Sequence, residues 1–455
     1  MKLKIKKLLP IMQESEIDLS KKMLVFVGKN NAGKTYVSKL IWSIYNIDDL
    51  ILHKGKINVF NNENKEKSGW TINLKQISND IQNVYNKNLN QFLKKIYKEK
   101  EVDVEVIFED KDWQNFKLYA EFENPIYKVI IKKEQESFDI DIAIEKKGDI
   151  KIKGLEKEEL DFINVIKNDS INKMNEFVYF VIIKTLLNTH TVYLPESRLI
   201  LPKFYKHLLV SQKQKIKELF DFEILLERKR RYKKDLPFES DIIEDELIDK
   251  MVLELEDEQK NNYISMLEQI MEGKIKVKRN EELSLSYFVY DNGEIELPME
   301  RSSSMVNQLT LLYLYFKYWY KKKRSNFLII DEPEMNLHPE KKVELTEFLM
   351  DFASKNKLLM TTHSHTMAKA IINYIDLLDL KENNLKKYRE ILNEYGLKDL
   401  YLNNNDIGIY YFNGSGIIPY KDKNETNIHF GTFTEIEKKL EDIYWKIDDF
   451  KEAAW

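Results

Sequence analysis

The sequence reads Gly28-Lys29-Asn30-Asn31-Ala32-Gly33-Lys34-Thr35 between a short apolar run, Met23–Val27, and helical spacing over Thr35–Tyr45. It fits the pattern G-x-x-x-x-G-K-[ST]. The glycines let a loop wrap closely, so that backbone N–H groups and the N-terminus of the following helix face a phosphate. We therefore expect a strand, a phosphate-binding loop and a helix in this order, with a nucleotide held by the loop.

Several positions of this loop have an expected partner in ATP. Lys34 is placed to reach the β- and γ-phosphates, and the Thr35 hydroxyl to ligate Mg²⁺. The alternative is a chance match in a turn, which the flanking patterns and the scarcity of glycine, 13 in 455 residues, disfavour. The predicted nucleotide-binding residues of the loop are Lys29, Asn30, Asn31, Ala32, Gly33, Lys34 and Thr35.

A second motif places two carboxylates after a buried strand. The apolar run Phe327–Ile330 is followed by Asp331-Glu332-Pro333-Glu334. Ligands bind at the carboxyl ends of strands in open α/β sheets. We expect Asp331 to hold Mg²⁺, directly or through water, and Glu332 to polarise the attacking water. A plain turn is the alternative, and the phosphate-binding loop makes it the weaker one.

Composition limits the other classes of function. The chain has 72 Lys and Arg against 76 Asp and Glu, a net charge of −4, and no Cys. Disulfides and thiolate metal sites are therefore excluded. No apolar run approaches the length of a membrane span, and no secretory signal is expected, so we predict a cytoplasmic protein without membrane association. Balanced charge does not favour a dedicated nucleic-acid binder, and DNA binding stays open.

Periodicity predicts how the rest of the chain is organised. Strand alternation marks Lys2–Lys6 and an antiparallel sheet over Val102–Ile152, and helical spacing runs through the charged segment from Ser211 to Glu272. Further patterns indicate strands at Leu283–Leu297 and Leu358–Thr361, helices at Val306–Lys321 and Glu435–Phe450, and a hairpin of Ile407–Phe412 with Gly416–Tyr420. The expected segments are 1–200 (a first lobe with the phosphate-binding loop and the antiparallel sheet), 201–282 (a helical insert), 283–325 (the region of the helix that precedes the second motif) and 326–455 (the second motif and the remainder of the core).

The second motif carries a family resemblance. Asp331-Glu332-Pro333-Glu334 with Leu337-His338-Pro339 resembles the Walker B motif and D-loop of ABC-type ATPases of the SMC, RecF and OLD group. Thr361-Thr362-His363-Ser364 is similar to their switch-histidine loop, which implies that His363 contacts the γ-phosphate. The resemblance implies an α/β fold: an ABC-type P-loop ATPase head with an antiparallel β subdomain and a helical lobe or insert. The family's Q-loop residue stays open between Gln76 and Gln82.

The same family carries a signature loop ahead of Walker B. Its counterpart is Arg301-Ser302-Ser303-Ser304-Met305-Val306-Asn307-Gln308, with Ser304 where the family has Gly. In the family this loop binds the γ-phosphate on the opposite subunit, which implies a head-to-tail homodimer, or a larger assembly, with Ser302, Ser303 and Ser304 as further ATP contacts. The alternative is a plain N-cap of the next helix.

Resemblance also suggests a biological role. The serine-rich segment and Tyr193-Leu194-Pro195-Glu196-Ser197-Arg198 look most like the AriA-type ATPase subunits of PARIS anti-phage systems. This implies a phage-protein trigger and a separate effector nuclease. Septu-type ATPases are close competitors, and a RecF-like DNA-repair ATPase is the alternative. An intrinsic OLD-type nuclease is not expected, because no clear acidic metal cluster follows residue 375.

Overall fold

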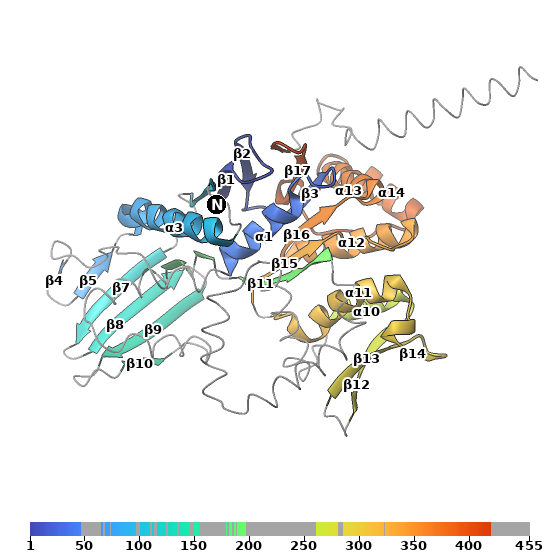
Figure 1. The fold of residues 1–455 in the computed structure, drawn as a ribbon, viewed down its shortest axis with the longest axis horizontal. Coiled ribbons are helices and arrows are strands. Elements are labelled where there is room, and N and C mark those ends of the chain that lie inside the picture. Colours follow the sequence, from blue (N-terminus) through green and yellow to red (C-terminus); the bar gives the residue numbers. More distant parts are fainter. Residues whose placement is uncertain are drawn as a thin grey trace, which may run out of the picture. The chain divides into compact units, whose positions relative to one another are not determined.

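The computed structural model describes residues 1–46, 101–109, 189–196, 261–280, 285–322 and 324–419, helix α3, the strands between residues 65 and 153, and single positions up to 187. The chain forms two compact units (Figure 1). The first comprises Met1–Leu8, Glu16–Leu19 and Ile44–Asn188, and the second comprises Leu9–Ser15, Ser20–Ser43 and Thr189–Trp455. The segment limits expected at 200, 282 and 325 stay a prediction.

The first unit contains two sheets. Strands β1 (Lys2–Lys7), β2 (Ser15–Asp18) and β6 (Asp103–Ile107) form one, in the order β2-β1-β6. The other confirms the antiparallel sheet predicted over Val102–Ile152 from residue 116 onward, whereas the start of that prediction forms β6 in the first sheet. Its order is β10 (Ile150–Lys153), β9 (Glu136–Ile144), β8 (Ile126–Lys133), β7 (Phe116–Glu123), β5 (Gly69–Ile72) and β4 (Lys65–Glu66).

Helix α3 (Leu74–Ile96) supplies side chains that continue the hydrogen bonding of β6. Asn86 and Asn90 each donate to and accept from the backbone of Val106 and Val104, respectively. Gln82 accepts from the backbone N–H of Phe108 at 2.9 Å. Gln82, one of the two Q-loop candidates, thus has a structural contact within this unit, and the side chain of Gln76 lies outside the described residues.

The second unit is built on a mostly parallel sheet. Its order is β11 (His190–Leu194), β15 (Asn326–Asp331), β16 (Lys357–Thr362), β3 (Met23–Gly28), β17 (Ile407–Phe412) and β18 (Ile417–Pro419). All neighbours are parallel except the predicted hairpin β17–β18. Every residue of β3 and β15 is buried, as expected for strands covered on both faces.

Helices follow the strands that carry the motifs. They are α1 (Lys34–Tyr45), α12 (Pro339–Lys355), α13 (His365–Asn383) and α14 (Leu385–Tyr395), with 3₁₀ turns at Met299–Arg301 and Asn404–Asp406. Strand β16 lies between β3 and β15, so its carboxyl end separates the phosphate-binding loop from the Asp331 motif (Figure 1). Among the described helices, none has the length and apolarity that crossing a membrane requires.

Part of the second unit departs from the predicted elements. The helix predicted over Val306–Lys321 is α-helical over Ser304–Leu314 (α11) and ends in a π-helical turn, Tyr315–Trp319. The segment 201–282, predicted to be helical, contains α10 (Asn262–Met271) but ends in strand β12 (Lys274–Asn280).

Strand β12 pairs with β13 (Leu285–Asp291), which pairs with β14 (Glu296–Pro298). The rest of the predicted insert, the residues Ser197 and Arg198 and the predicted helix Glu435–Phe450 lie outside the described residues.

Candidate nucleotide site

The loop after β3 has the backbone of a phosphate-binding loop. Gly28 and Gly33 have φ of +151° and +95°, and Asn31 has φ of 59°. A Cβ on Gly28 would lie 2.3 Å from the backbone oxygen of Phe412 on β17. Only glycine fits there, because a side chain would meet a neighbouring strand as well as an unfavourable φ. Strand β17 therefore fixes the path of the loop.

Lys34, the first residue of α1, folds back onto this loop. Its ammonium donates to the backbone oxygens of Gly28 at 3.0 Å and Lys29 at 2.8 Å, and the residue is only 4% exposed. Burial lowers the pKa of Lys34 to about 8, against the opposing charges of Glu332 and Asp331. The cation is thus held inside the loop, where phosphate oxygens could replace the carbonyl groups as its acceptors.

Asp331 ends β15 with a buried carboxylate that accepts from three hydroxyl groups. Ser38 and Thr361 donate to Oδ1 at 3.1 and 3.0 Å, and Tyr193 donates to Oδ2. The donors come from α1, β16 and β11. This arrangement compensates the burial of the charge and fixes the direction of the carboxylate.

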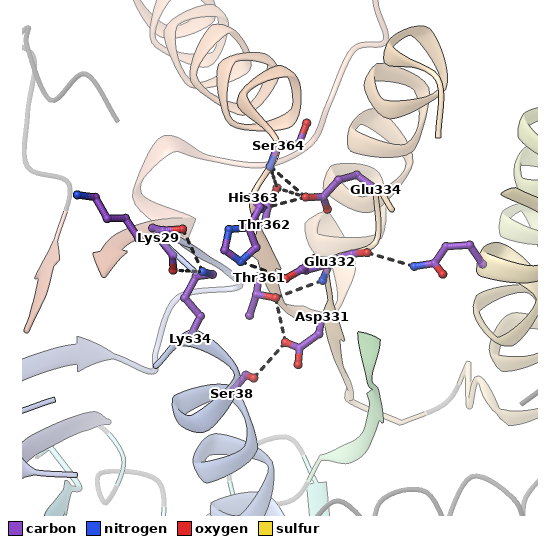
Figure 2. A network of polar contacts seen from close by, with 12 residues as sticks. Lys29, Lys34, Ser38, Asp331, Glu332, Glu334, Thr361, Thr362, His363 and Ser364 are labelled. Atoms are coloured by element: carbon purple, nitrogen blue, oxygen red, sulfur yellow. Dashed lines mark hydrogen bonds and ion pairs between the residues drawn. The ribbon is translucent and has the colours of Figure 1, made fainter. Parts of the chain in front are cut away.

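The next residue, Glu332, has φ of 44°, a value rare outside glycine and common at functional sites. Its backbone N–H donates to Thr361 at the end of β16. Its Oε1 lies 3.1 Å from Nε2 of His363, and both side chains are partly exposed. Figure 2 shows Lys34, Glu332 and His363 turned toward one space above the strand ends.

The described residues fit a Mg²⁺ ion together with a nucleotide. The Thr35 hydroxyl and the Asp331 carboxylate offer the oxygen ligands that Mg²⁺ prefers. Mg²⁺ usually keeps several waters and takes one or two protein ligands. The described part of the chain has no cluster of three or more His, Cys, Asp and Glu residues suited to a metal. Mg²⁺ would thus be held with help from phosphate groups.

The serine-rich segment lies in the same unit, and its side chains act locally. Ser302 is buried and donates to the Pro298 backbone, Ser303 caps α11 by accepting from Val306, and Ser304 is exposed. In the described structure no hydrogen bond joins Ser302, Ser303 or Ser304 to the phosphate-binding loop. Helix α11 still reaches the site, because the Gln308 side chain donates to the backbone oxygen of Glu332 at 3.3 Å.

The structure thus brings together Lys34, Asp331, Glu332 and His363. Thr35 follows Lys34 in α1, and the described side-chain hydrogen bonds of Ser302 and Ser303 stay near their own segment. Sequence reasoning missed the three hydroxyl donors to Asp331. Ser38 had a signal, because it follows Lys34 by four residues on one helix face. The other two depend on strand order, which no local pattern reveals.

The chain matches the family model for an AAA ATPase domain over residues 2–368, most of its length. The chain belongs to the AAA ATPase domain family. The P-loop ATPase fold predicted from the sequence is thereby confirmed. No curated protein matches this AAA ATPase in sequence.

Solved structures of SMC heads are similar to this AAA ATPase at low identity. One is an SMC head bound to the C-terminal winged-helix domain of ScpA, with 10% identity, 94% and 99% of the two chains covered and a TM-score of 0.36. Another is the SMC head domain from Thermotoga maritima, with 10% identity, 92% and 98% covered and a TM-score of 0.31. With such scores these likenesses add nothing to the family assignment.

Proposed function

We propose that this AAA ATPase binds Mg²⁺ and ATP at the loop 28–35 and hydrolyses the nucleotide. The observation that carries the proposal is the convergence of Lys34, Asp331, Glu332 and His363 at the carboxyl ends of three adjacent strands. The ammonium of Lys34 would hold the β- and γ-phosphates, within the backbone N–H groups of residues 29–33. Thr35 and Asp331 would hold Mg²⁺, which when bound would supply positive charge to neutralise the phosphate groups.

The side chains beyond Lys34 suit attack by water. Glu332 would take a proton from the water whose oxygen forms the new bond to the γ-phosphorus. The bond from that phosphorus to the bridging oxygen breaks, and ADP leaves with the electron pair. His363, 3.1 Å from Glu332, would orient the carboxylate and contact the γ-phosphate. The three hydroxyl groups that donate to Asp331 keep the carboxylate of Asp331 in place next to Glu332.

The proposed working form is a head-to-tail homodimer in the cytoplasm, with an ATP between each loop 28–35 and the partner's segment 302–304. Ser304 is exposed at the start of an α-helix, where a hydroxyl and free N–H groups favour an anion. The bond from Gln308 to Glu332 supports communication, since it joins this helix to the hydrolytic loop of the same subunit.

In the cell, we propose that dimer closure controls a separate effector nuclease in anti-phage defence, as in the AriA-type subunits of PARIS systems. A phage protein would be the trigger. The support is the sequence resemblance in the segments 193–198 and 301–306. Binding of DNA by the closed heads, as in RecF-like repair ATPases, is the competing outcome of the experiment below.

The test compares the wild type with Glu332→Gln. The wild type is expected to hydrolyse ATP, and the variant to bind ATP, lose turnover and accumulate as a closed dimer by mass measurement. Absence of hydrolysis in the wild type, or full turnover by the variant, would refute the proposed chemistry. A pull-down of the ATP-loaded variant from native cells then separates the two roles: a co-purifying nuclease supports defence, and retained DNA without a nuclease supports repair.

A further inference from the structure

Glu334 places a buried carboxylate beneath the loop that carries His363. The residue is 4% exposed, and its Oε1 accepts from the Thr362 hydroxyl at 2.5 Å and from the backbone N–H groups of His363 at 3.0 Å and Ser364 at 3.1 Å. Its Oε2 is buried and has no hydrogen-bond partner in the described part of the chain. Figure 2 shows Glu334 reaching the start of α13.

A buried carboxylate is unfavourable unless donors compensate it. Here all three donors come from consecutive residues of one loop, and all meet one oxygen. Burial raises the pKa of Glu334, and the hydrogen bonds from Thr362 and His363 oppose that rise. Burying the Glu334 carboxylate with Oε2 lacking a hydrogen-bond donor in the described structure is unfavourable for stability. Such a group is expected to have a functional role.

Capping of α13 does not account for Glu334. Ser364 is already the N-cap of that helix, and its hydroxyl accepts from the backbone N–H of Met367 at 3.3 Å. A helix that begins with its own serine cap needs no distant carboxylate to start. The effect of Glu334 is instead to fix the backbone on either side of the His363 peptide N–H.

The loop 331–334 thus holds the loop 361–364 at several points. Thr361 donates to Asp331 and accepts the N–H of Glu332, and Glu334 holds the next three residues. Between these contacts, the His363 ring meets Glu332 at 3.1 Å. Two acidic residues of one motif, separated by Pro333, therefore contact the same histidine, Glu332 at its ring and Glu334 at its backbone.

We propose that Glu334 is a positioning residue that locks the loop 362–364 onto the loop 331–334 and thereby sets His363 relative to Glu332. This inference rests on the proposed ATP hydrolysis for its effect on turnover. The expected effect of Glu334 on the loop 362–364 rests on the hydrogen bonds alone. A misplacement of about 1 Å at a reacting centre can lower turnover about 100-fold, so a fixed loop matters to the reaction.

The test uses the full chain as wild type, Glu334→Ala, Glu334→Gln, Thr362→Val and the control Glu340→Ala. Glu340 lies six residues further on, exposed in the first turn of α12. Hydrogen–deuterium exchange without nucleotide should show the amide of residue 363 exchanging at least about tenfold faster in Glu334→Ala and unchanged in the control. The amide of residue 364 is a weaker readout, because the Ser364 N–H also donates to the Thr362 hydroxyl at 2.9 Å. Glu334→Gln keeps an acceptor oxygen and should restore part of the protection.

Steady-state kinetics complete the test. In Glu334→Ala we expect kcat to fall about 100-fold while KM for ATP changes by no more than about twofold, with partial recovery in Glu334→Gln. Wild-type exchange at residue 363 in Glu334→Ala would overturn the proposal, as would faster exchange throughout the chain.

If Glu334→Ala fails to fold, Thr362→Val decides by exchange at the amide of residue 363. This variant removes the hydroxyl that donates to Glu334, and residue 364 is left out because the same hydroxyl accepts from its N–H. A wild type without ATP hydrolysis would refute the proposed function, and the exchange result would still decide the role of Glu334 in the loop.

Discussion

The hydroxyl of Tyr193 offers a measurable test of the core of the site. Tyr193 is 2% exposed on β11, and it donates to Oδ2 of Asp331, 138 residues away. In Tyr193→Phe the ring still fills its volume, so the change removes a donor and creates almost no cavity. A hydrogen bond to a buried charged group contributes about 1.5–3 kcal/mol, so we expect the free energy of unfolding to fall by about 2 kcal/mol.

The assay is urea unfolding of the nucleotide-free protein, followed by tryptophan fluorescence, with Tyr401→Phe as the matched control. Tyr401 is 74% exposed, so loss of its hydroxyl should leave the unfolding midpoint unchanged. Ser38 lies 3.1 Å from the Tyr193 hydroxyl and donates to the same carboxylate, so the effects of Tyr193→Phe and Ser38→Ala should be non-additive. A loss below about 0.5 kcal/mol in Tyr193→Phe would refute the reasoning.

Three further outcomes follow from the same site. Burial lowers the pKa of Lys34 to about 8, so the ammonium is charged below that pH and lost above it. ATP affinity measured from pH 7 to 9.5 should therefore stay constant up to about pH 8 and then fall by about tenfold per pH unit. An affinity that stays constant over the whole range would contradict this. Gly28→Ala should destabilise the protein by about 2 kcal/mol or more and abolish nucleotide binding, because its Cβ would lie 2.3 Å from the Phe412 oxygen; normal binding in a filter assay would exclude that account. Asn307 donates to the backbone oxygens of Met299, Ser302 and Ser303, so Asn307→Ala should cost about 2 kcal/mol in thermal unfolding, and exposed Asn393→Ala should not.

The parts of the fold predictable from sequence are those whose signal is local. The loop 28–35 has its glycines, its lysine and its flanking strand and helix within a short window. The strand before Asp331 could be recognised because four apolar residues lead into two carboxylates. Such features need no knowledge of what lies beside them, since the backbone conformation alone requires those residue types.

The missed features depend on neighbours that are distant in sequence. Strand β12 is the exception, because its alternation of Lys274, Ile275, Lys276, Val277 and Lys278 is a local strand pattern that lies within the segment 201–282 expected to be helical. The π-helical turn after Leu314 arises in a dense aromatic cluster with Tyr263 and Phe352, which sequence spacing does not show. Which hydroxyl groups surround Asp331 likewise depends on strand order in the parallel sheet.

Strand order also dictates when this site is able to form during synthesis. Strand β3 pairs with β16 on one side and with β17 on the other, and Lys22, just before it, forms an ion pair with Asp406, 384 residues further along. At about 5–20 residues per second, the ribosome needs about 20–80 s to deliver that partner. Until then, an apolar strand and the glycine loop after it leave the ribosome without the neighbours that shape them. A chain stopped short of β17 would keep the whole nucleotide-binding signature and lack the Phe412 backbone against which Gly28 rests. The proposed nucleotide binding is therefore expected only after β17 has been synthesised and has paired with β3.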